Sequence, residues 1–323
     1  MLTIYIGSIY QLEHRISAGT IAEFVVYINM LTFPVSAIGW VASNTQRAAA
    51  SQKRLNEFLK TKPVIHDYPQ AINIDSVNEI SFKSVDFIYP HTGIHAVKKF
   101  DLHIKKGQKV ALIGKTGCGK STIAQLLLRM YDPVSGSIQI NNHDLTTINL
   151  KSLRSSISYV PQDVFLFSDT IKNNINFGNG SDDLESARTA AHKAVILDEI
   201  ESLATGFDTM VGERGVTLSG GQKQRISIAR ALSKRSELLI FDDCLSAVDA
   251  KTEHAIAKML NEFLIERTAL VITHRIFPAF TFDQIIVMDD GQITEQGTHQ
   301  ELVQLGGYYA RLLKTQADDL TNN

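Results

Sequence analysis

Residues Gly114–Ser121 read Gly-Lys-Thr-Gly-Cys-Gly-Lys-Ser. This stretch matches the pattern of a phosphate-binding loop, in which a glycine, any four residues and a second glycine precede Lys-Ser or Lys-Thr. Val110–Ile113, just before the loop, form an apolar run that predicts a strand, and Thr122–Arg129, just after it, predict a helix. The order of strand, glycine-rich loop and helix is the structural context that this pattern requires.

The residue types of the loop suit a polyphosphate. Gly114, Gly117 and Gly119 can adopt positive φ, so that successive backbone N–H groups turn toward an anion. Lys120 would then reach the β- and γ-phosphates, and the Ser121 hydroxyl would bind Mg²⁺. A helix that begins near Lys120 directs the positive end of its dipole at the same place. The alternative without a ligand is a glycine-rich turn with an exposed lysine.

Length, charge and cysteine content narrow the class of protein. A chain of 323 residues allows about two domains. The net charge of −2 lacks the basic footprint of a nucleic-acid-binding protein, so we expect no nucleic-acid partner. The two cysteines, Cys118 and Cys244, lie in stretches that we assign to a nucleotide site. They form no disulfide framework, and a reduced cytosolic setting fits them.

The first part of the chain is much more apolar than the rest. Thr20–Val41 offers 22 mostly apolar residues, enough to span a bilayer, interrupted by Glu23, Asn29 and Pro34. Met1–Tyr10 is too short to span and reads as the broken end of a longer membrane helix, followed by a polar break at 11–19. A buried helix of a soluble domain is the alternative for Thr20–Val41. Positive charges after this run place its C-terminal end in the cytoplasm, and they are Arg47, Lys53, Arg54, Lys60 and Lys62.

The rest of the chain predicts an α/β fold. The apolar helix continues to about residue 60, and residues 63–78, with two prolines and no clean period, read as a linker. From Glu79 short strands appear, first at Ser81–Tyr89 and His95–Ile104, then at Ser137–Ile140 and Ile157–Val160. Helices and strands alternate from Gly220 to Thr294, which indicates a parallel α/β core. Residues 317–323 read as a frayed tail.

Two further motifs belong to the predicted nucleotide site. Leu238–Asp242 is an apolar strand that ends in an acid, and Asp242 would hold Mg²⁺ through water opposite Ser121. Leu218–Gln222 reads Leu-Ser-Gly-Gly-Gln, in which Ser219 is a good helix N-cap. Gly220 and Gly221 let the backbone approach a ligand closely, and Gln222 completes the motif.

Together these stretches resemble the nucleotide-binding domain of ATP-binding cassette (ABC) transporters, from about Glu79 to Lys314. The resemblance implies a P-loop NTPase fold with an antiparallel β lobe and a helical signature subdomain. It implies that ATP and Mg²⁺ are the cofactors and that the loop residues contact the nucleotide. The expected contacts in the loop are Gly114, Lys115, Thr116, Gly117, Cys118, Gly119, Lys120, Ser121 and Thr122.

The resemblance also assigns roles outside the loop. Tyr89 matches the aromatic residue that stacks on adenine, and Gln162 matches a glutamine that touches Mg²⁺ and senses the membrane domain. His274 matches the histidine that contacts the γ-phosphate. Val211–Gly215 resembles a segment that contacts the intracellular loops in exporters, and Ser246–Asp249 resembles a loop that crosses to the partner subunit. Without the family, each would read as an ordinary core, turn or surface residue.

One residue departs from the family pattern. The position after Asp242 is usually a glutamate, the base that polarises the attacking water, but here it is Asp243. The shorter side chain withdraws the carboxylate by ~1.5 Å, about one bond length. Because a general base must lie within about 2.6–3.2 Å of its proton, we expect weak hydrolysis at the site built on this loop, with binding intact.

The N-terminal stretch resembles the end of an exporter's membrane domain, so residues 1–62 are expected to belong to that domain and 79–316 to the nucleotide-binding domain. The resemblance implies that two nucleotide-binding domains pair head to tail, with the membrane domains in lipid. Asp243 favours a heterodimer over a homodimer. Two alternatives stay open. One is a soluble ABC ATPase, and the other is a subunit of a heterodimer that mainly binds ATP and regulates its partner.

Cys118 admits two interpretations of equal weight. It lies beside a helix N-terminus and next but one to Lys120, and both features lower a thiol's pKa. The thiol would then react quickly with maleimide and be protected by ATP. The alternative is a small, inert filler residue.

Overall fold

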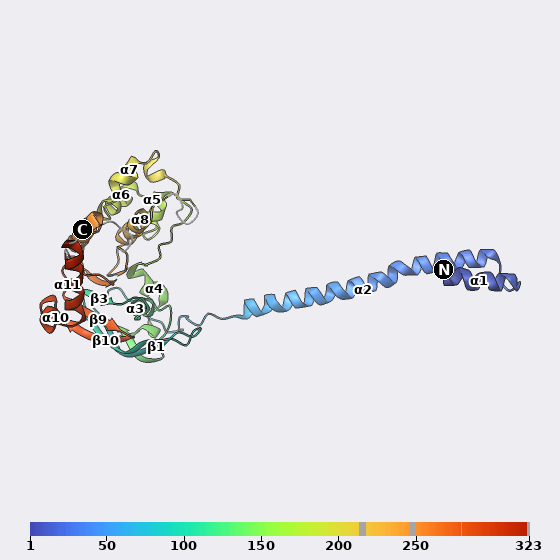
Figure 1. Ribbon diagram of the computed structural model, residues 1–323, viewed down its shortest axis with the longest axis horizontal. Coiled ribbons are helices and arrows are strands. Elements are labelled where there is room, and N and C mark those ends of the chain that lie inside the picture. Colours follow the sequence, from blue (N-terminus) through green and yellow to red (C-terminus); the bar gives the residue numbers. More distant parts are fainter. Residues whose placement is uncertain (213–217, 246–249, 279, 322–323) are drawn as a thin grey trace. The chain divides into compact units, whose positions relative to one another are not determined.

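The computed structural model describes residues 1–212, 218–245, 250–278 and 280–321. The chain divides into two compact units, Met1–Val64 and Ile65–Asn323 (Figure 1). The larger unit therefore begins within the stretch that the sequence suggests is a linker. Each unit has its own packing.

The smaller unit consists of two helices, α1 (Leu2–Leu12) and α2 (Ala18–Lys60). Helix α2 begins at Ser17, whose side chain accepts a hydrogen bond from the Thr20 backbone N–H. Its two polar interruptions are satisfied locally, since the Tyr27 hydroxyl donates to Glu23 (3.0 Å) and the Asn29 amide donates to the Val25 carbonyl (3.1 Å). Each of these side chains therefore has a hydrogen-bond partner within the helix.

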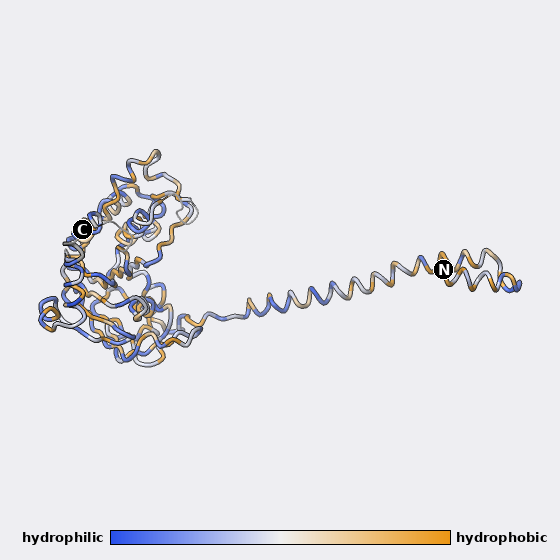
Figure 2. Tube along the Cα trace, viewed as in Figure 1, coloured by the Kyte–Doolittle hydropathy of each residue, from blue (hydrophilic) through white to orange (hydrophobic). Residues whose placement is uncertain are grey.

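Helix α2 is 43 residues long, and its most apolar 18-residue window has a mean hydropathy of 1.6, so it is long and apolar enough to cross a membrane. No residue of α2 is buried within the chain. Figure 2 shows hydrophilic colours gathered in the second half of the helix, where the positive charges lie. Length, composition and exposure together fit a helix whose first half lies in lipid.

An antiparallel sheet forms the first layer of the larger unit. Its four strands run in the order β2-β1-β4-β5. Their bounds are Glu79–Ile88 for β1, His95–Lys105 for β2, Ser135–Ile140 for β4 and His143–Asp144 for β5. Strand β1 alternates buried and outward residues at its start, as expected for a sheet with one face on a core.

The second sheet has six strands in the order β10-β9-β3-β8-β7-β6. The bounds are β3 Lys109–Gly114, β6 Ile157–Val160, β7 Leu238–Asp242, β8 Thr268–Thr273, β9 Gln284–Asp289 and β10 Gln292–Gly297. All neighbours pair in parallel except β10, which runs antiparallel to β9. The expected parallel core is therefore mixed at one edge. Strands β7 and β8 are buried at every residue, which explains why their sequences are continuous apolar runs.

Helices cover the sheets and form a separate helical layer. Helices α5, α6, α7 and α8 pack on one another, and Figure 1 shows them as a group. Helix α11 extends to Thr321, past the point where the sequence suggests a tail. The helix bounds are α3 Lys120–Leu127, α4 Leu150–Ser155, α5 Ile171–Asn176, α6 Leu184–Lys193, α7 Leu197–Ser202, α8 Gly220–Ser233, α9 Ala250–Phe263, α10 His299–Leu305 and α11 Tyr308–Thr321, with short 3₁₀ turns at Leu145–Thr147 and Gly206–Asp208.

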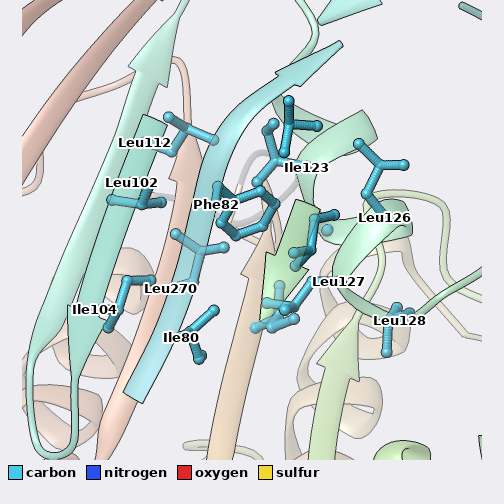
Figure 3. Close-up of a cluster of buried hydrophobic side chains, with 14 of the residues drawn as sticks. Ile80, Phe82, Leu102, Ile104, Leu112, Ile123, Leu126, Leu127, Leu128 and Leu270 are labelled. Atoms are coloured by element: carbon cyan, nitrogen blue, oxygen red, sulfur yellow. The ribbon is translucent and has the colours of Figure 1, made fainter. Parts of the chain in front are cut away.

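The core that positions the glycine loop lies around helix α3. Phe82 and Ile80 of β1, Leu112 of β3, and Ile123 and Leu126 of α3 share one buried cluster (Figure 3). Residues from both sheets meet α3 in this cluster, so the helix is fixed on several sides. The loop before α3 is thereby held between a buried strand and a buried helix.

Leu112→Ala should destabilise the larger unit, because it leaves a cavity in this cluster. We expect a loss of about 2–5 kcal/mol in the free energy of unfolding, measured by denaturant titration of the full chain in detergent. Val303→Ala is the matched control: Val303 is 40% exposed in α10, and its change should stay within about 0.5 kcal/mol. Equal losses in the two variants would contradict this view of the core.

Candidate functional site

A cleft of about 270 Å³ opens at the carboxyl ends of β3, β7 and β8. Parallel strands bring residues that are far apart in the sequence to this edge of the sheet. Most of the predicted site residues line it. The lining comprises Tyr89, Ile94, Ala96, Thr116, Gly117, Gly119, Lys120, Ser121, Thr122, Gln162, Asp242, Asp243, Ile272 and His274.

Glycine is required in the loop for two different structural reasons. Gly117 and Gly119 have φ of 84° and 102°, as expected from the sequence. Gly114 does not adopt positive φ, so that expectation is wrong. It ends β3, and a Cβ there would lie 2.3 Å from the Met288 carbonyl oxygen and 2.7 Å from the Cys118 Sγ. Close backbone packing, not a left-handed conformation, therefore requires glycine at 114.

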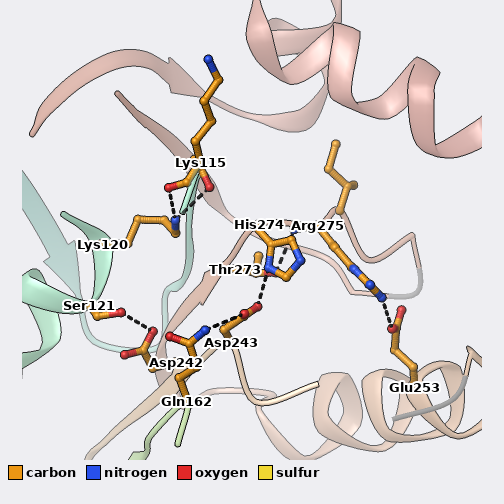
Figure 4. Close-up of polar contacts among 12 residues, drawn as sticks. Lys115, Lys120, Ser121, Gln162, Asp242, Asp243, Glu253, Thr273, His274 and Arg275 are labelled. Atoms are coloured by element: carbon orange, nitrogen blue, oxygen red, sulfur yellow. Dashed lines mark hydrogen bonds and ion pairs between the residues drawn. The ribbon is translucent and has the colours of Figure 1, made fainter. Parts of the chain in front are cut away.

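Lys120 is buried rather than exposed, which rules out the ligand-free alternative of a turn with a solvent-facing lysine. Only 8% of the residue is accessible. Its ammonium donates to the carbonyl oxygens of Gly114 (2.8 Å) and Lys115 (2.7 Å) (Figure 4). A buried ammonium needs oxygen partners, and two carbonyls supply no negative charge. The loop thus holds a cation at the wall of an open cleft, as an anion site requires.

Ser121 and Asp242 meet across the cleft, as the sequence predicts. The Ser121 hydroxyl donates to Asp242 Oδ1 (3.0 Å), and the Tyr159 hydroxyl donates to Asp242 Oδ2 (3.1 Å). Burial raises the pKa of Asp242, and burial beside this carboxylate raises the pKa of Tyr159. The hydroxyl and the carboxylate offer the hard oxygen atoms that Mg²⁺ prefers.

The described part of the chain contains no cluster of three or more His, Cys, Asp or Glu side chains that could hold a metal ion. A magnesium ion at Ser121 and Asp242 would therefore need further oxygens from the nucleotide and water. That arrangement is usual for Mg²⁺, which is commonly bound by one or two carboxylates together with phosphate oxygens.

Asp243 is held by two of the predicted site residues. Its Oδ1 lies 2.9 Å from His274 Nδ1, and its Oδ2 accepts a longer hydrogen bond (3.4 Å) from the Gln162 amide. The backbone of Asp243 has φ of 48°, a left-handed conformation that aspartate tolerates better than most residues. Figure 4 shows these three side chains converging from separate segments. Strain and convergence of this kind are common at functional sites.

Tyr89 is oriented by Thr122, which the sequence predicts, and by Gln125, which sequence reasoning missed. Its hydroxyl donates to Gln125 Oε1 (2.9 Å) and lies 2.9 Å from the Thr122 hydroxyl. Its ring packs edge-on against Phe87 and Tyr131. Gln125 lies one helical turn after Thr122, and that spacing could have identified it. Tyr159, the other missed residue, carries no motif of its own.

The Leu-Ser-Gly-Gly-Gln motif lies outside the lining of this cleft. Ser219 caps α8 in a reciprocal pair with Gln222, and Gly220 begins the helix. Glu199 of α7 braces this end of α8, since it accepts from the Gln222 amide (3.1 Å) and pairs with Arg225 (2.5 Å). Ser219 and Gly220 stay exposed. The N-terminus of α8 is therefore capped by its own side chains and exposed at its first residues.

Two predicted segments cannot be placed. Ser246–Asp249 lies outside the described residues, as do positions 213–215 of the Val211–Gly215 segment.

Of the two interpretations of Cys118, the structure favours the small, inert filler residue. Burial raises the pKa of Cys118, and this effect outweighs the opposing influence of Lys120. The side chain is only 7% accessible and contributes to the core cluster beside the loop. Cys118 is therefore a small, inert residue that fills space in the core cluster.

Comparisons with known proteins agree with this geometry. A family model described as "ABC transporter" matches residues 97–246. The chain is 42% identical over 303 residues to the "Probable multidrug resistance ABC transporter ATP-binding/permease protein YheI" of Bacillus subtilis, covering 94% of this chain and 52% of the relative. It is 40% identical over 316 residues to an "ATP-dependent lipid A-core flippase" of Pectobacterium atrosepticum, covering 97% and 54%.

The fold is also similar to a solved structure, described as "Structure of a bacterial Atm1-family ABC exporter with ATP bound". The TM-score is 0.82 at 35% identity, over 94% of this chain and 53% of that one. The chain thus spans about half the length of the relatives that it matches.

Gly114→Ala and Gly117→Ala should differ in a way that tests the reason for each glycine. A Cβ at Gly117 meets nothing within 4 Å, so its variant should lose only the cost of a left-handed residue, about 1–2 kcal/mol. Gly114→Ala forces the β9 carbonyl away and should cost more, seen as a lower Tm of the full chain without nucleotide. The reverse order would contradict the packing role of Gly114.

Proposed function

Because the chain belongs to the ABC transporter family, we propose that it is the ATP-binding and ATP-hydrolysing part of a membrane exporter subunit. The observation that carries this proposal is the cleft in which Lys120, Ser121 and Asp242 meet Gln162, Asp243 and His274. A phosphate-holding cation, a metal-holding pair and a polarising carboxylate are the parts that phosphoryl transfer to water requires.

Binding of the nucleotide follows from the loop. The backbone N–H groups of Gly117 and Gly119 and the ammonium of Lys120 would hold the phosphates, with the N-terminus of α3 adding its dipole. Ser121 and Asp242, with Gln162 beside them, would hold the Mg²⁺ that neutralises charge on the phosphates. Tyr89, fixed by Gln125 and Thr122, would offer its ring to the adenine.

Hydrolysis at this cleft depends on Asp243. Its carboxylate would accept a hydrogen bond from the attacking water, and His274 would donate to the γ-phosphate. Because the aspartate is one methylene shorter than glutamate, its reach is ~1.5 Å less. Gln162 and His274 both contact the carboxylate, so it is also held in place. We infer that this chain binds ATP well and hydrolyses it slowly at its own cleft.

The exposed signature motif supports a partner. Its helix N-terminus faces solvent and lies outside the cleft of its own chain, as expected if Ser219 completes the γ-phosphate site of a second subunit. A weak base combined with an intact signature favours a heterodimer in which the partner carries glutamate at the position of Asp243. The two nucleotide clefts of the heterodimer would then differ, with slow hydrolysis at the cleft of this chain and faster hydrolysis at the cleft of the partner.

We assign residues 1–62 to the membrane domain and 79–316 to the cytoplasmic nucleotide-binding domain. The apolar length of α2, and the absence of buried residues in it, support a membrane location. The alternative, a soluble ABC ATPase, makes a different prediction for carbonate washing of membranes. An exporter subunit resists extraction, whereas a soluble ATPase is released.

Lys120→Ala should weaken Mg-ATP binding severely, because it removes the point charge that faces the phosphates. The affinity is measured by isothermal titration calorimetry of the full chain in detergent. Lys115→Ala is the control, since Lys115 meets Lys120 through its backbone carbonyl, which alanine retains, and does not line the cleft. Undiminished affinity in Lys120→Ala would refute the nucleotide site.

Asp243→Glu should raise hydrolysis at this cleft, whereas Asp243→Asn should hardly change the turnover of the assembled heterodimer. Losing a competent general base typically costs 10²–10⁴-fold, so extending a short one should recover part of that range. Single-turnover hydrolysis of bound ATP, with the natural partner present, provides the measurement.

Ser219→Ala is the matched comparison, because Ser219 serves the partner's cleft. It should reduce the turnover of the complex far more than Asp243→Asn does. If Asp243→Asn abolished turnover as completely as the Ser219 change, the asymmetric assignment would be wrong.

A further inference from the structure

Residues 65–78, here called the strap, are fastened along the surface of the larger unit. Asp67 accepts hydrogen bonds from the Leu150 N–H (2.7 Å) and the Asn149 amide (3.0 Å). Ile72 pairs with Ile148 in a short parallel bridge, and Ile74 exchanges hydrogen bonds with the Ser152 hydroxyl. The strap is thus tied to the start of α4 at three places.

A further tie comes from Arg129, two residues after α3. Its Nη2 donates to the His66 carbonyl (3.3 Å), and its Nε donates to Asp132 Oδ1 (3.0 Å). The residue is 1% exposed, and its Nη1 has no hydrogen-bond partner in the described part of the chain. Its backbone has φ of 48°.

Stability alone gives no reason for arginine here. The position after a helix C-cap, in a left-handed conformation, is one where glycine is usual and avoids about 1–2 kcal/mol of strain. Burying a guanidinium with one unsatisfied group adds a further cost. What arginine provides, and glycine does not, is a rigid fork that joins Asp132 to the strap. A residue that carries strain at such a junction points to a function.

Both elements that hold the strap also reach the nucleotide cleft. Helix α3 begins at Lys120, and Lys120, Ser121 and Thr122 line the cleft. Its eight residues span about 12 Å, so the helix is a short, buried rod from the loop to Arg129. Helix α4 leads into β6, which ends at Val160, two residues before Gln162. The strap is therefore bonded by Arg129, beyond the end of α3 that is far from the cleft, and by the start of α4, from which the chain leads through β6 to Gln162.

We propose that Arg129 is a positioning residue that transmits nucleotide occupancy from α3 to the strap. The strap is continuous with α2 through Thr61–Val64, so a change in its fastening reaches the membrane helix along the chain. This inference rests on the proposed function, because it requires that nucleotide bind at the cleft. ATP that orders the loop and α3 would hold the Arg129 fork in place and reduce opening of the strap.

The test is hydrogen–deuterium exchange of residues 65–78 in the full chain in detergent, with and without Mg-ATP. The amides of Ile72 and Ile74 report on the fastening, because both are hydrogen-bonded to the α4 side. In the native chain ATP should slow their exchange about fivefold, the lower end of typical coupling between sites. In Arg129→Met this ATP effect should vanish, while ATP affinity measured by calorimetry stays within about threefold.

Asp132→Asn is the matched control. It weakens the hydrogen bond between Arg129 and residue 132 but leaves the hydrogen bond from Arg129 to the His66 carbonyl. The exchange of the strap amides should therefore become faster but should still slow when ATP binds. Arg129→Lys serves as a second variant if the methionine variant does not fold. A lysine has one point-like head and cannot bridge Asp132 and His66 as the fork does, so its ATP effect should also be lost.

An ATP effect in Arg129→Met or Arg129→Lys as large as in the native chain would overturn the proposal. The proposal would also be overturned if calorimetry shows that ATP binds the native chain but the hydrogen–deuterium exchange of the strap does not change. Absence of ATP binding in the native chain would instead refute the proposed function, so the two failures are distinguishable.

Discussion

The buried ammonium of Lys120 is the constraint on which the site depends. A cation that is 8% exposed must have oxygen partners, and the loop provides them by turning the carbonyls of Gly114 and Lys115 inward. That turn requires Gly117 and Gly119 in left-handed conformations and Gly114 against the β9 backbone. The fold supports it from both sides, with β3 paired to β8 and β9 and with α3 fixed between the sheets. Since the hydrogen-bond partners of the ammonium are two neutral carbonyls, the cleft is prepared for a polyanion.

Local patterns of the sequence predicted the loop and the order of elements around it well. The runs at Val110–Ile113 and Leu238–Asp242 are nearly continuous in apolar residues, and such runs are typical of strands that are buried on both faces. The meeting of Ser121 with Asp242 was predicted from the phosphate loop and the strand that ends in an acid, and the parallel strands bring the two together at one edge. The roles of Gln162 and His274 came from resemblance, and the structure brings both to Asp243.

Other features depend on tertiary packing and had no local signal. The requirement for glycine at 114 is one example. The Cys118 thiol fills the space that a Cβ at 114 would need. Tyr159 reaches Asp242 only because β6 pairs with β7, and no motif marks it. The stretch 65–78 lacks periodicity, yet side chains from α4 and Arg129 fasten it. Every residue has a backbone carbonyl, so a long-range hydrogen bond to one leaves no pattern in the sequence of the accepting stretch.

The most direct test of the central claim is a calorimetric titration of the native chain with ATP, in magnesium and again in excess chelator. The account predicts saturable binding of one nucleotide per chain, with clearly weaker binding once magnesium is removed, because Ser121 and Asp242 then have no ion to hold against the phosphates. Absence of saturable binding, or an affinity that magnesium does not change, would contradict it.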